Sequence, residues 1–187
     1  MKRKDNKNLI PAGGFTLIEL LVVTAITAII AAVSISNFRA AENRKRVVLA
    51  IDGIVSSLSL AQSYTLAGKN TNNAQATCRS PQYYYITFTY TNTYTMYALD
   101  NCGQTDLIQS FTLPDNTQMS TSGLILDSVA ASTNLRIAFY PPFAQIRSAI
   151  DIATNNTFST AAITVQSLDG SESKTVTVDG VVGRISR

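Results

Sequence analysis

The sequence predicts an α+β protein, in which one long N-terminal helix packs against an antiparallel β-sheet of a globular domain. Two observations predict this class. An apolar run near the N-terminus continues into a segment whose apolar residues recur at three- and four-residue spacing, the helical period. After Cys78 the pattern changes to short runs of aromatic and β-branched residues separated by turn residues, which is typical of strands joined in hairpins.

The helix is expected to run from Phe15 to Ala67, with Gly53 as a weak point and Gly68 as its C-cap. Its apolar stripe consists of Val47, Ile51, Ile54, Leu58 and Ala61. The expected strands are 83–90, 94–99, 107–113, 124–129, 135–140, 162–168, 174–178 and 181–185. The polar segment 151–160 is expected to be a loop.

The composition excludes several classes of function. The 187 residues include no histidine, which removes Ser-His-Asp triads and histidine-ligated metals. Two cysteines cannot build a four-cysteine zinc site. No spacing groups the Ser, Asp and Lys residues into a catalytic arrangement. We therefore expect no enzymatic activity, no cofactor and no metal.

The net charge of +3 is distributed unevenly along the chain. Residues 1–14 carry four basic residues and one acidic residue, which already accounts for +3. A second basic cluster lies at residues 39–46. From Ile51 onward seven basic and nine acidic residues give a charge of −2, so the sequence contains no generally basic domain.

Residues 15–35 form an apolar stretch with one charged side chain, Glu19. A helix of this length, rising about 1.5 Å per residue, covers a hydrocarbon core of about 30 Å. The basic residues before it favour a cytoplasmic N-terminus, and the cluster at 39–46 competes with them. The stretch fits a cleaved secretory signal peptide, a plain anchor, or an anchor whose Glu19 has a partner on another chain. A carboxylate in an apolar helix costs about 2.5–3.5 kcal/mol near the bilayer centre, which favours the third interpretation.

The segment GFTLIELLVV at residues 14–23 resembles the processing motif of type IV prepilins and type II secretion pseudopilins. The resemblance implies cleavage after Gly14 by a prepilin peptidase, N-methylation of Phe15, and retention of the apolar segment as an anchor and later as filament core. It also implies that Glu19 pairs with the N-terminal amine of an adjacent subunit. Both charges are costly when unpaired in a low dielectric, which supports this role. The alternative is an interfacial glutamate that extends toward the headgroups.

The resemblance further implies the pilin fold and an organisation of the whole chain. A basic leader at 1–14 is followed by a transmembrane and assembly helix at 15–35, an amphipathic continuation at 36–68 and an extracytoplasmic β-rich domain at 69–187. The implied location is the inner (cytoplasmic) membrane, crossed once with the N-terminus inside, and then a pilus or pseudopilus. The implied partners are other pilin or pseudopilin subunits, the peptidase and N-methyltransferase, and an inner-membrane assembly platform.

One position departs from the family pattern. Many members carry a proline shortly after the apolar run, where this chain has Ser36. Without proline the helix keeps its backbone hydrogen bond there, so we expect less bending.

Cys78 and Cys102 flank the first expected hairpin. A turn centred on Asn92 pairs residues whose numbers sum to about 184, and the two cysteine numbers sum to 180. We therefore expect the two cysteines to face each other and to form a disulfide outside the cytoplasm. Closing this loop would stabilise the domain by roughly 3 kcal/mol. The alternative is two separate buried thiols.

Short matches in the globular part resemble the minor pseudopilin GspH and the minor pilin FimT. They are LAQS at 60–63, similar to an LAR-x-A stretch, FYPP at 139–142, and VVGRI at 181–185. Phe143 and Ala144 stand where that group has a glycine. The resemblance indicates a minor pilin or pseudopilin, a structural subunit of a type IV pilus or type II secretion pseudopilus.

DNA binding is the alternative function. FimT-like proteins are associated with DNA uptake through a C-terminal Gly-Arg-x-Arg, and here the second arginine, Arg187, lies one position late after Arg184. Residues three apart in a strand point to opposite faces, and the domain is net negative, so we favour the structural role. The sequence leaves open whether Arg136, Arg147 and Lys174 gather in space.

The tyrosines also allow two interpretations. They are Tyr83, Tyr84, Tyr85, Tyr90, Tyr94 and Tyr97. Such rings stack on bases or sugars in some proteins. Alternating aromatic residues in a hairpin more often form cross-strand packing pairs, which is the interpretation we favour.

Overall fold

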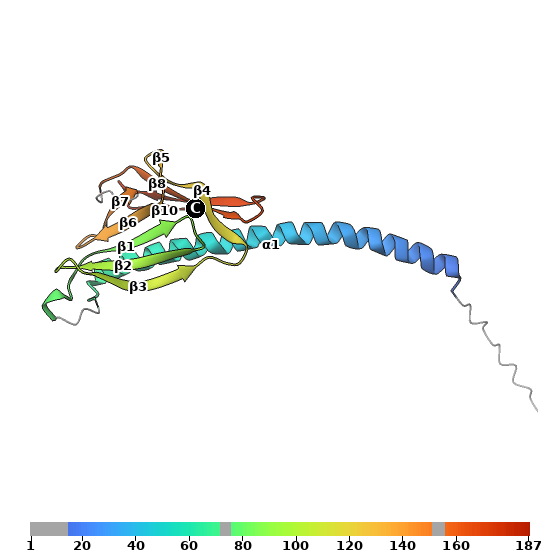
Figure 1. The fold of residues 1–187 in the computed structure, drawn as a ribbon, viewed down its shortest axis with the longest axis horizontal. Helices are drawn as coiled ribbons and strands as arrows, with labels where there is room; N and C mark the ends of the chain where they lie inside the picture. The colour runs from blue at the N-terminus through green and yellow to red at the C-terminus, as the bar shows by residue number, and fades with distance from the viewer. Residues whose placement is uncertain (1–14, 72–75, 151–155) are drawn as a thin grey trace, which may run out of the picture. The chain divides into compact units, whose positions relative to one another are not determined.

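The computed structural model describes residues 15–71, 76–150 and 156–187 (Figure 1). Within these ranges, the side chains of residues 33–37 and 76 are not described. The chain divides into two compact units, Met1–Arg39 and Ala40–Arg187. Helix α1, Leu17–Ala67, contributes to both units and is followed by the short 3-10 helix η1, Ala76–Cys78, and ten β-strands. The α+β class predicted from the sequence is therefore confirmed, and it is consistent with the pilin fold.

The first unit contains the beginning of α1. The helix starts at Leu17 rather than at Phe15, because Thr16 provides the cap. Every side chain from Phe15 to Ala32 is exposed.

In the second unit α1 buries its apolar stripe. Val47, Ile51 and Ile54 are at most 1% exposed, and Leu58 and Ala61 are fully buried. The helix ends at Ala67, as the sequence predicts. Gly68 then adopts a positive φ of 60°, and the N–H groups of Gly68 and Lys69 donate to the carbonyls of Thr65 and Tyr64.

The first sheet has five antiparallel strands in the order β3-β2-β1-β6-β7. They are β1 (Pro81–Thr89), β2 (Thr93–Asp100), β3 (Thr105–Thr112), β6 (Asn134–Tyr140) and β7 (Gln145–Ile150). Side chains alternate between its two faces, so Tyr84, Ile86 and Phe88 of β1 are buried in the core together with Leu135, Ile137 and Phe139 of β6.

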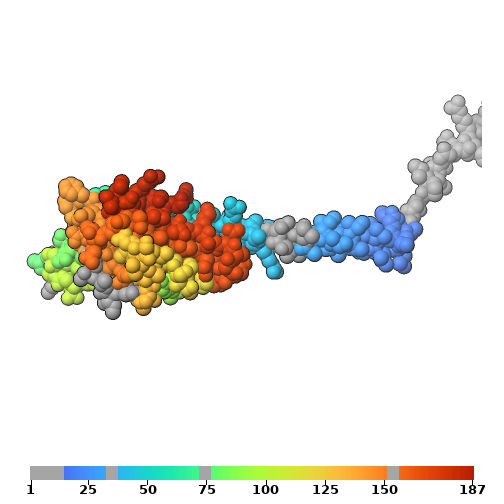
Figure 2. Space-filling model, turned by 90° about the horizontal axis from the view of Figure 1, so that it is seen from above, coloured from blue at the N-terminus to red at the C-terminus, as the bar shows by residue number. Residues whose placement is uncertain are grey.

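The second sheet also has five antiparallel strands, in the order β10-β9-β8-β4-β5. They are β4 (Thr117–Leu126), β5 (Val129–Ala130), β8 (Thr160–Ser167), β9 (Ser173–Asp179) and β10 (Ile185–Ser186). On the face seen in Figure 2, residues of β4 (yellow) and of β8–β10 (orange to red) lie side by side. The antiparallel pairing agrees with the predicted class, and the sequence did not specify that the strands divide into two sheets. The inner faces of both sheets join the α1 stripe in one core.

Three strand predictions need correction. Strand β4 begins at Thr117 rather than at residue 124, and β7 was not predicted. The expected strand 181–185 is reduced to β10. The carboxylate of Asp179 accepts hydrogen bonds from the N–H groups of Val181 and Val182 at 2.8 and 2.9 Å, which holds this segment in a turn.

The expected loop 151–160 is described only from Asn156 onward. Ser148 and Asn156 form an isolated bridge, and Thr160 already belongs to β8.

The predicted disulfide is present. Cys78 and Cys102 are bonded, with their Cα atoms 5.3 Å apart. The register is slightly different from the expected one, since pairs such as Tyr84 with Ala98 centre the hairpin on Thr91 rather than on Asn92. An irregularity near Pro81 shifts the open end, where the two cysteines meet.

Candidate assembly segment and C-terminal arginines

The first turn of α1 is held by its own side chains. The N–H of Glu19 donates to the hydroxyl of Thr16 at 3.3 Å, and the N–H of Leu20 donates to the Thr16 carbonyl at 3.2 Å. Threonine at the cap with glutamate three residues later is the sequence of a capping box. A carboxylate in the first turn also interacts favourably with the helix dipole. The local sequence therefore fixes Glu19 at the third helical position.

Apolar side chains surround this end of the helix on all sides. Phe15 is 80% exposed and Leu17 is 83% exposed, and the other exposed apolar residues are Ile18, Leu20, Leu21, Val22, Val23, Ile26, Ile29 and Ile30. A helix that is apolar all round requires an apolar environment. The hydroxyls of Thr24 and Thr27 donate to the carbonyls of Leu21 and Thr24 at 2.9 and 3.0 Å, which satisfies them within the helix. The segment Leu17–Ala32 is thus suited to lipid or to the apolar surface of neighbouring helices.

A second part of α1 also has the length and composition of a membrane span. The most apolar 18-residue window within Phe38–Ala67 has a mean hydropathy of 1.4, but 39% of this window is buried inside the domain. Core helices of soluble domains have the same properties. Because Leu17–Ala32 is apolar and exposed throughout, it is the better candidate for the anchor.

Glu19 is the only charged side chain in this apolar segment. Within residues 15–32, and against the rest of the described chain, its carboxylate forms no ion pair. Phe15, whose amine the processed chain would expose, lies at the start of the same segment. Gly14 falls outside the described residues. The arrangement therefore offers one anionic group on an apolar rod, four residues from the predicted processed end.

The two C-terminal arginines flank β10, and an acidic side chain pairs with one of them. Arg187 forms an ion pair with Asp52 of α1, so its charge is compensated within the domain. Arg184 lies just before β10, and its carbonyl accepts a hydrogen bond from the N–H of Asp179 at 2.8 Å. Lys174 lines a pocket together with Asp52 and Arg187.

Arg136 and Arg147 belong to the first sheet, whereas the C-terminal pair flanks β10 of the second sheet. They occupy β6 and β7 of the first sheet, and each guanidinium lies over a tyrosine ring. We did not predict this grouping of arginine and tyrosine. A signal was present in the alternation of the YYYITFTY segment at 83–90, which places Tyr83 and Tyr85 on one face and Tyr84 on the other.

The tyrosines mostly pack, as the sequence predicts. Tyr94 stacks between Phe88 and Phe111, with ring centroids 5.3 and 5.0 Å away. Burial raises the pKa of Tyr84 to about 12, and its hydroxyl donates to the carbonyl of Lys69. These rings are core elements and are not available to a ligand.

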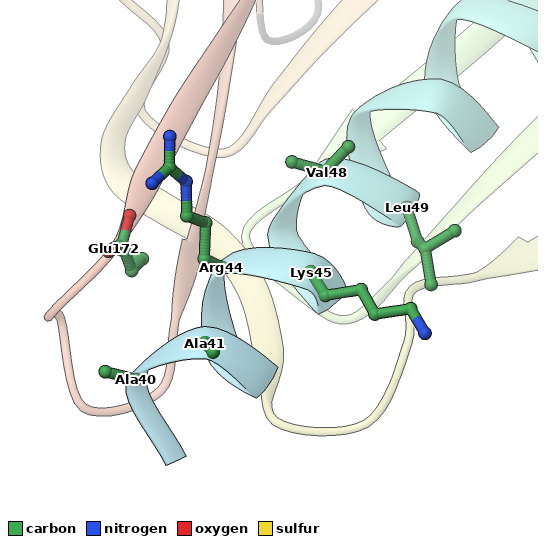
Figure 3. Close-up of a pocket in the computed structure, with 7 residues that line it drawn as sticks. All are labelled: Ala40, Ala41, Arg44, Lys45, Val48, Leu49 and Glu172. Atoms are coloured by element: carbon green, nitrogen blue, oxygen red, sulfur yellow. The ribbon is translucent and has the colours of Figure 1, made fainter. Parts of the chain in front are cut away.

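A hollow on α1 adjoins the loop before β9 (Figure 3). Arg44 and Glu172 line one side of the hollow, and Lys45 points away from them. The other lining residues are Ala40, Ala41, Val48 and Leu49, so most of the surface is apolar. In the described part of the chain, no three His, Cys, Asp or Glu side chains group as metal ligands.

Comparison with known proteins locates similarity at the N-terminus. The family model described as the prokaryotic N-terminal methylation motif matches residues 11–35. No curated protein and no solved structure matches the chain. The match covers the capped apolar helix start that contains Phe15 and Glu19, and it indicates a chain of the type IV prepilin-like or pseudopilin kind.

Proposed function

We propose that this prepilin-like chain is a minor pilin or pseudopilin, a structural subunit of a type IV pilus or a type II secretion pseudopilus. The methylation motif points to a structural pilin-type protein rather than to an enzyme family. The chain is then the substrate of a prepilin peptidase and N-methyltransferase, cleaved after Gly14 and methylated at Phe15. It assembles with other pilin or pseudopilin subunits through an inner-membrane platform.

One observation carries this proposal: Leu17–Ala32 is exposed and apolar on every side, and its single charge is fixed near the helix start. A monomer in water would not tolerate this surface. Lipid covers it before assembly, and neighbouring helices cover it afterwards. The carboxylate of Glu19 then forms an ion pair with the N-terminal amine of the next subunit, and this pairing sets the axial position of each subunit.

Mass spectrometry of the mature protein tests the processing step. The proposal expects an N-terminus at methylated Phe15. An N-terminus beyond residue 34 would show an ordinary signal peptide and would refute the proposal. The orientation follows from the same step, because cleavage by the peptidase places the leader in the cytoplasm and the domain outside.

Substitutions at Glu19 test the pairing. Glu19→Gln retains the capping-box pattern and the size of the side chain but loses the charge. We expect both Glu19→Gln and Glu19→Val to insert normally and to be lost from filaments, as measured by immunogold counts on isolated filaments.

A cap variant provides the matched control. Thr16→Ala removes the hydroxyl that receives the Glu19 N–H but keeps the carboxylate. It is expected to enter filaments at near wild-type levels. Normal incorporation of Glu19→Gln together with loss of Thr16→Ala would mean that Glu19 acts only in capping.

Within this superfamily we place the chain in the GspH/FimT-like group. The turn after β6 supports this, because Ala144 adopts a left-handed φ of 50° at the place where that group has a glycine. DNA capture by Arg184 and Arg187 is less well supported, since Asp52 already pairs with Arg187. Salt-dependent DNA binding by the whole chain, abolished by Arg184→Ala and Arg187→Ala, would favour DNA capture. Absence of binding at low salt would exclude it.

A further inference from the structure

The outer face of the first sheet carries two rows of stacked side chains. In the first row Tyr97 of β2 stacks on Tyr85 of β1, with ring centroids 5.3 Å apart and an interplanar angle of 23°. The guanidinium of Arg136, on β6, lies 4.7 Å from the centroid of the same Tyr85 ring. Because β1 lies between β2 and β6, Tyr85 is covered from both sides.

The second row repeats this arrangement one strand further along. Tyr83 of β1 lies 4.5 Å from Tyr140 of β6, and the guanidinium of Arg147, on β7, lies 4.8 Å from the Tyr140 centroid. Cation–π contacts of this kind hold a guanidinium flat and reduce its freedom. Each row therefore ends in a rigidly placed arginine.

The two arginines are neighbours on the same face. Arg147 of β7 is directly opposite Ala138 of β6, and Ala138 is two residues from Arg136. Arg136 and Arg147 are therefore diagonal neighbours across the two strands. Diagonal positions of this kind lie about 7–8 Å apart, within the common reach of two long side chains. Like charges at this spacing repel each other unless an anion lies between them.

Neither guanidinium has an acidic partner among the described residues. The Nε atoms of both arginines are buried without a hydrogen-bond partner there, and Arg147 makes one long contact of 3.5 Å with the Gln145 side-chain oxygen. Buried donors without acceptors are rare in folded proteins. The surface thus has two ordered cations with unused donors.

The chemistry of this face favours a protein partner over a nucleic acid. Bases and sugars need open ring faces to stack on, and Tyr85 and Tyr140 are covered on both sides by their neighbours. The domain from Ile51 onward is net negative, so a polyphosphate chain would be repelled beyond the two arginines. Tyrosine and arginine are enriched in the energetically dominant centres of protein interfaces.

We propose that the outer face of the first sheet is a docking surface for a protein partner that places a single Asp or Glu carboxylate between Arg136 and Arg147. The planar carboxylate matches the forked donors of each guanidinium. The tyrosine rows hold the arginines in place before the partner arrives, which lowers the entropy cost of binding. This inference does not depend on the proposed filament role.

NMR of the arginine Nε–H signals tests the site on the full chain in detergent micelles. The probe is a capped tetrapeptide with two central glutamates, and the matched control peptide has two glutamines instead. We expect the signals of Arg136 and Arg147 to shift together and saturably with the acidic peptide alone. Inorganic phosphate and a short oligothymidylate serve as competing anions. No shift with the acidic peptide, or equal shifts with the oligonucleotide or phosphate, would overturn the proposal.

Arginine-to-lysine variants test whether binding requires the planar guanidinium group or only its charge. Arg136→Lys and Arg147→Lys keep the charge but lose the planar fork, and each should weaken peptide binding by about tenfold. Arg184→Lys, just before β10 of the second sheet, should leave binding unchanged. Equal binding by all three lysine variants would show that charge alone attracts the peptide and would contradict the built site. Near-UV circular dichroism of each variant confirms that the domain is folded.

Discussion

Two glycines in and after α1 should respond in opposite ways to the same substitution. Gly53 lies inside the helix on its exposed side, and a Cβ there would meet only the Tyr94 hydroxyl oxygen at 3.6 Å, an ordinary contact. Glycine in a helix interior costs about 0.8–1.0 kcal/mol relative to alanine. Gly53→Ala should therefore raise the free energy of unfolding by about 1 kcal/mol.

Gly68→Ala is the matched control. A Cβ at Gly68 would meet nothing within 4 Å, but the residue has a φ of +60°. An L-residue in this left-handed conformation costs about 1–2 kcal/mol, so the same added methyl group should destabilise the domain. The two variants differ in the sign of the effect because only one of the two positions has helical backbone angles.

The assay is thermal unfolding of the full chain in detergent micelles with the disulfide intact. Near-UV circular dichroism of the tyrosines follows the domain and not the apolar helix. A change of 1 kcal/mol shifts the Tm of a domain of this size by about 2–4 °C, so we expect a rise for Gly53→Ala and a fall for Gly68→Ala. A shift of both variants in the same direction would refute the assigned helix end.

Three further predictions concern the domain. Ser128 adopts a φ of 71° in the turn between β4 and β5, and Ser128→Gly should stabilise by about 0.5–1 kcal/mol in urea unfolding; a loss of stability would contradict this turn. Reduction of Cys78–Cys102, which closes a loop with a sequence separation of 24, should destabilise by about 3–4 kcal/mol, and an unchanged urea midpoint would count against it. Hydrogen bonds, first from the Ser167 hydroxyl, lower the pKa of Asp169 to about 2. The stability that this carboxylate adds is thus present above about pH 4 and lost as the pH falls through 2; a carboxyl NMR titration with a midpoint near 4 would refute it.

Features governed by local sequence could be predicted. The spacing of Val47, Ile51, Ile54 and Leu58 reports the buried side of α1 directly, because a helix repeats every 3.6 residues. Gly68 likewise marks the helix end through its own backbone angle. The hairpin that brings Cys78 and Cys102 together depends on a short turn, so the turn centre was predicted to within one residue and the cross-strand partners to within two.

Features that depend on side-chain competition or distant pairing were missed. The Asp179 carboxylate accepts hydrogen bonds from two backbone N–H groups, so the apolar segment Val181–Val182 forms a turn instead of a strand. The hydrophobicity of this segment does not indicate the turn. The first part of β4 is polar and lacked a strand signal. The ion pair between Arg187 and Asp52 joins residues 135 positions apart in the sequence, so no local pattern indicates it. The arginine–tyrosine rows require β1 to pair with β6, a register that no local pattern specifies.

The strand orders have a consequence for the way in which the chain folds. Both sheets contain strands from early and late parts of the sequence, and the chain passes from one sheet to the other after β3, after β5 and after β7. The second sheet has β4 beside β8, so it cannot close until the last quarter of the polypeptide is available. Long-range pairing of this kind slows folding. The hairpins of neighbouring strands, among them the disulfide-linked β1–β2 hairpin, form from local contacts, whereas the second sheet is completed only when β8 pairs with β4.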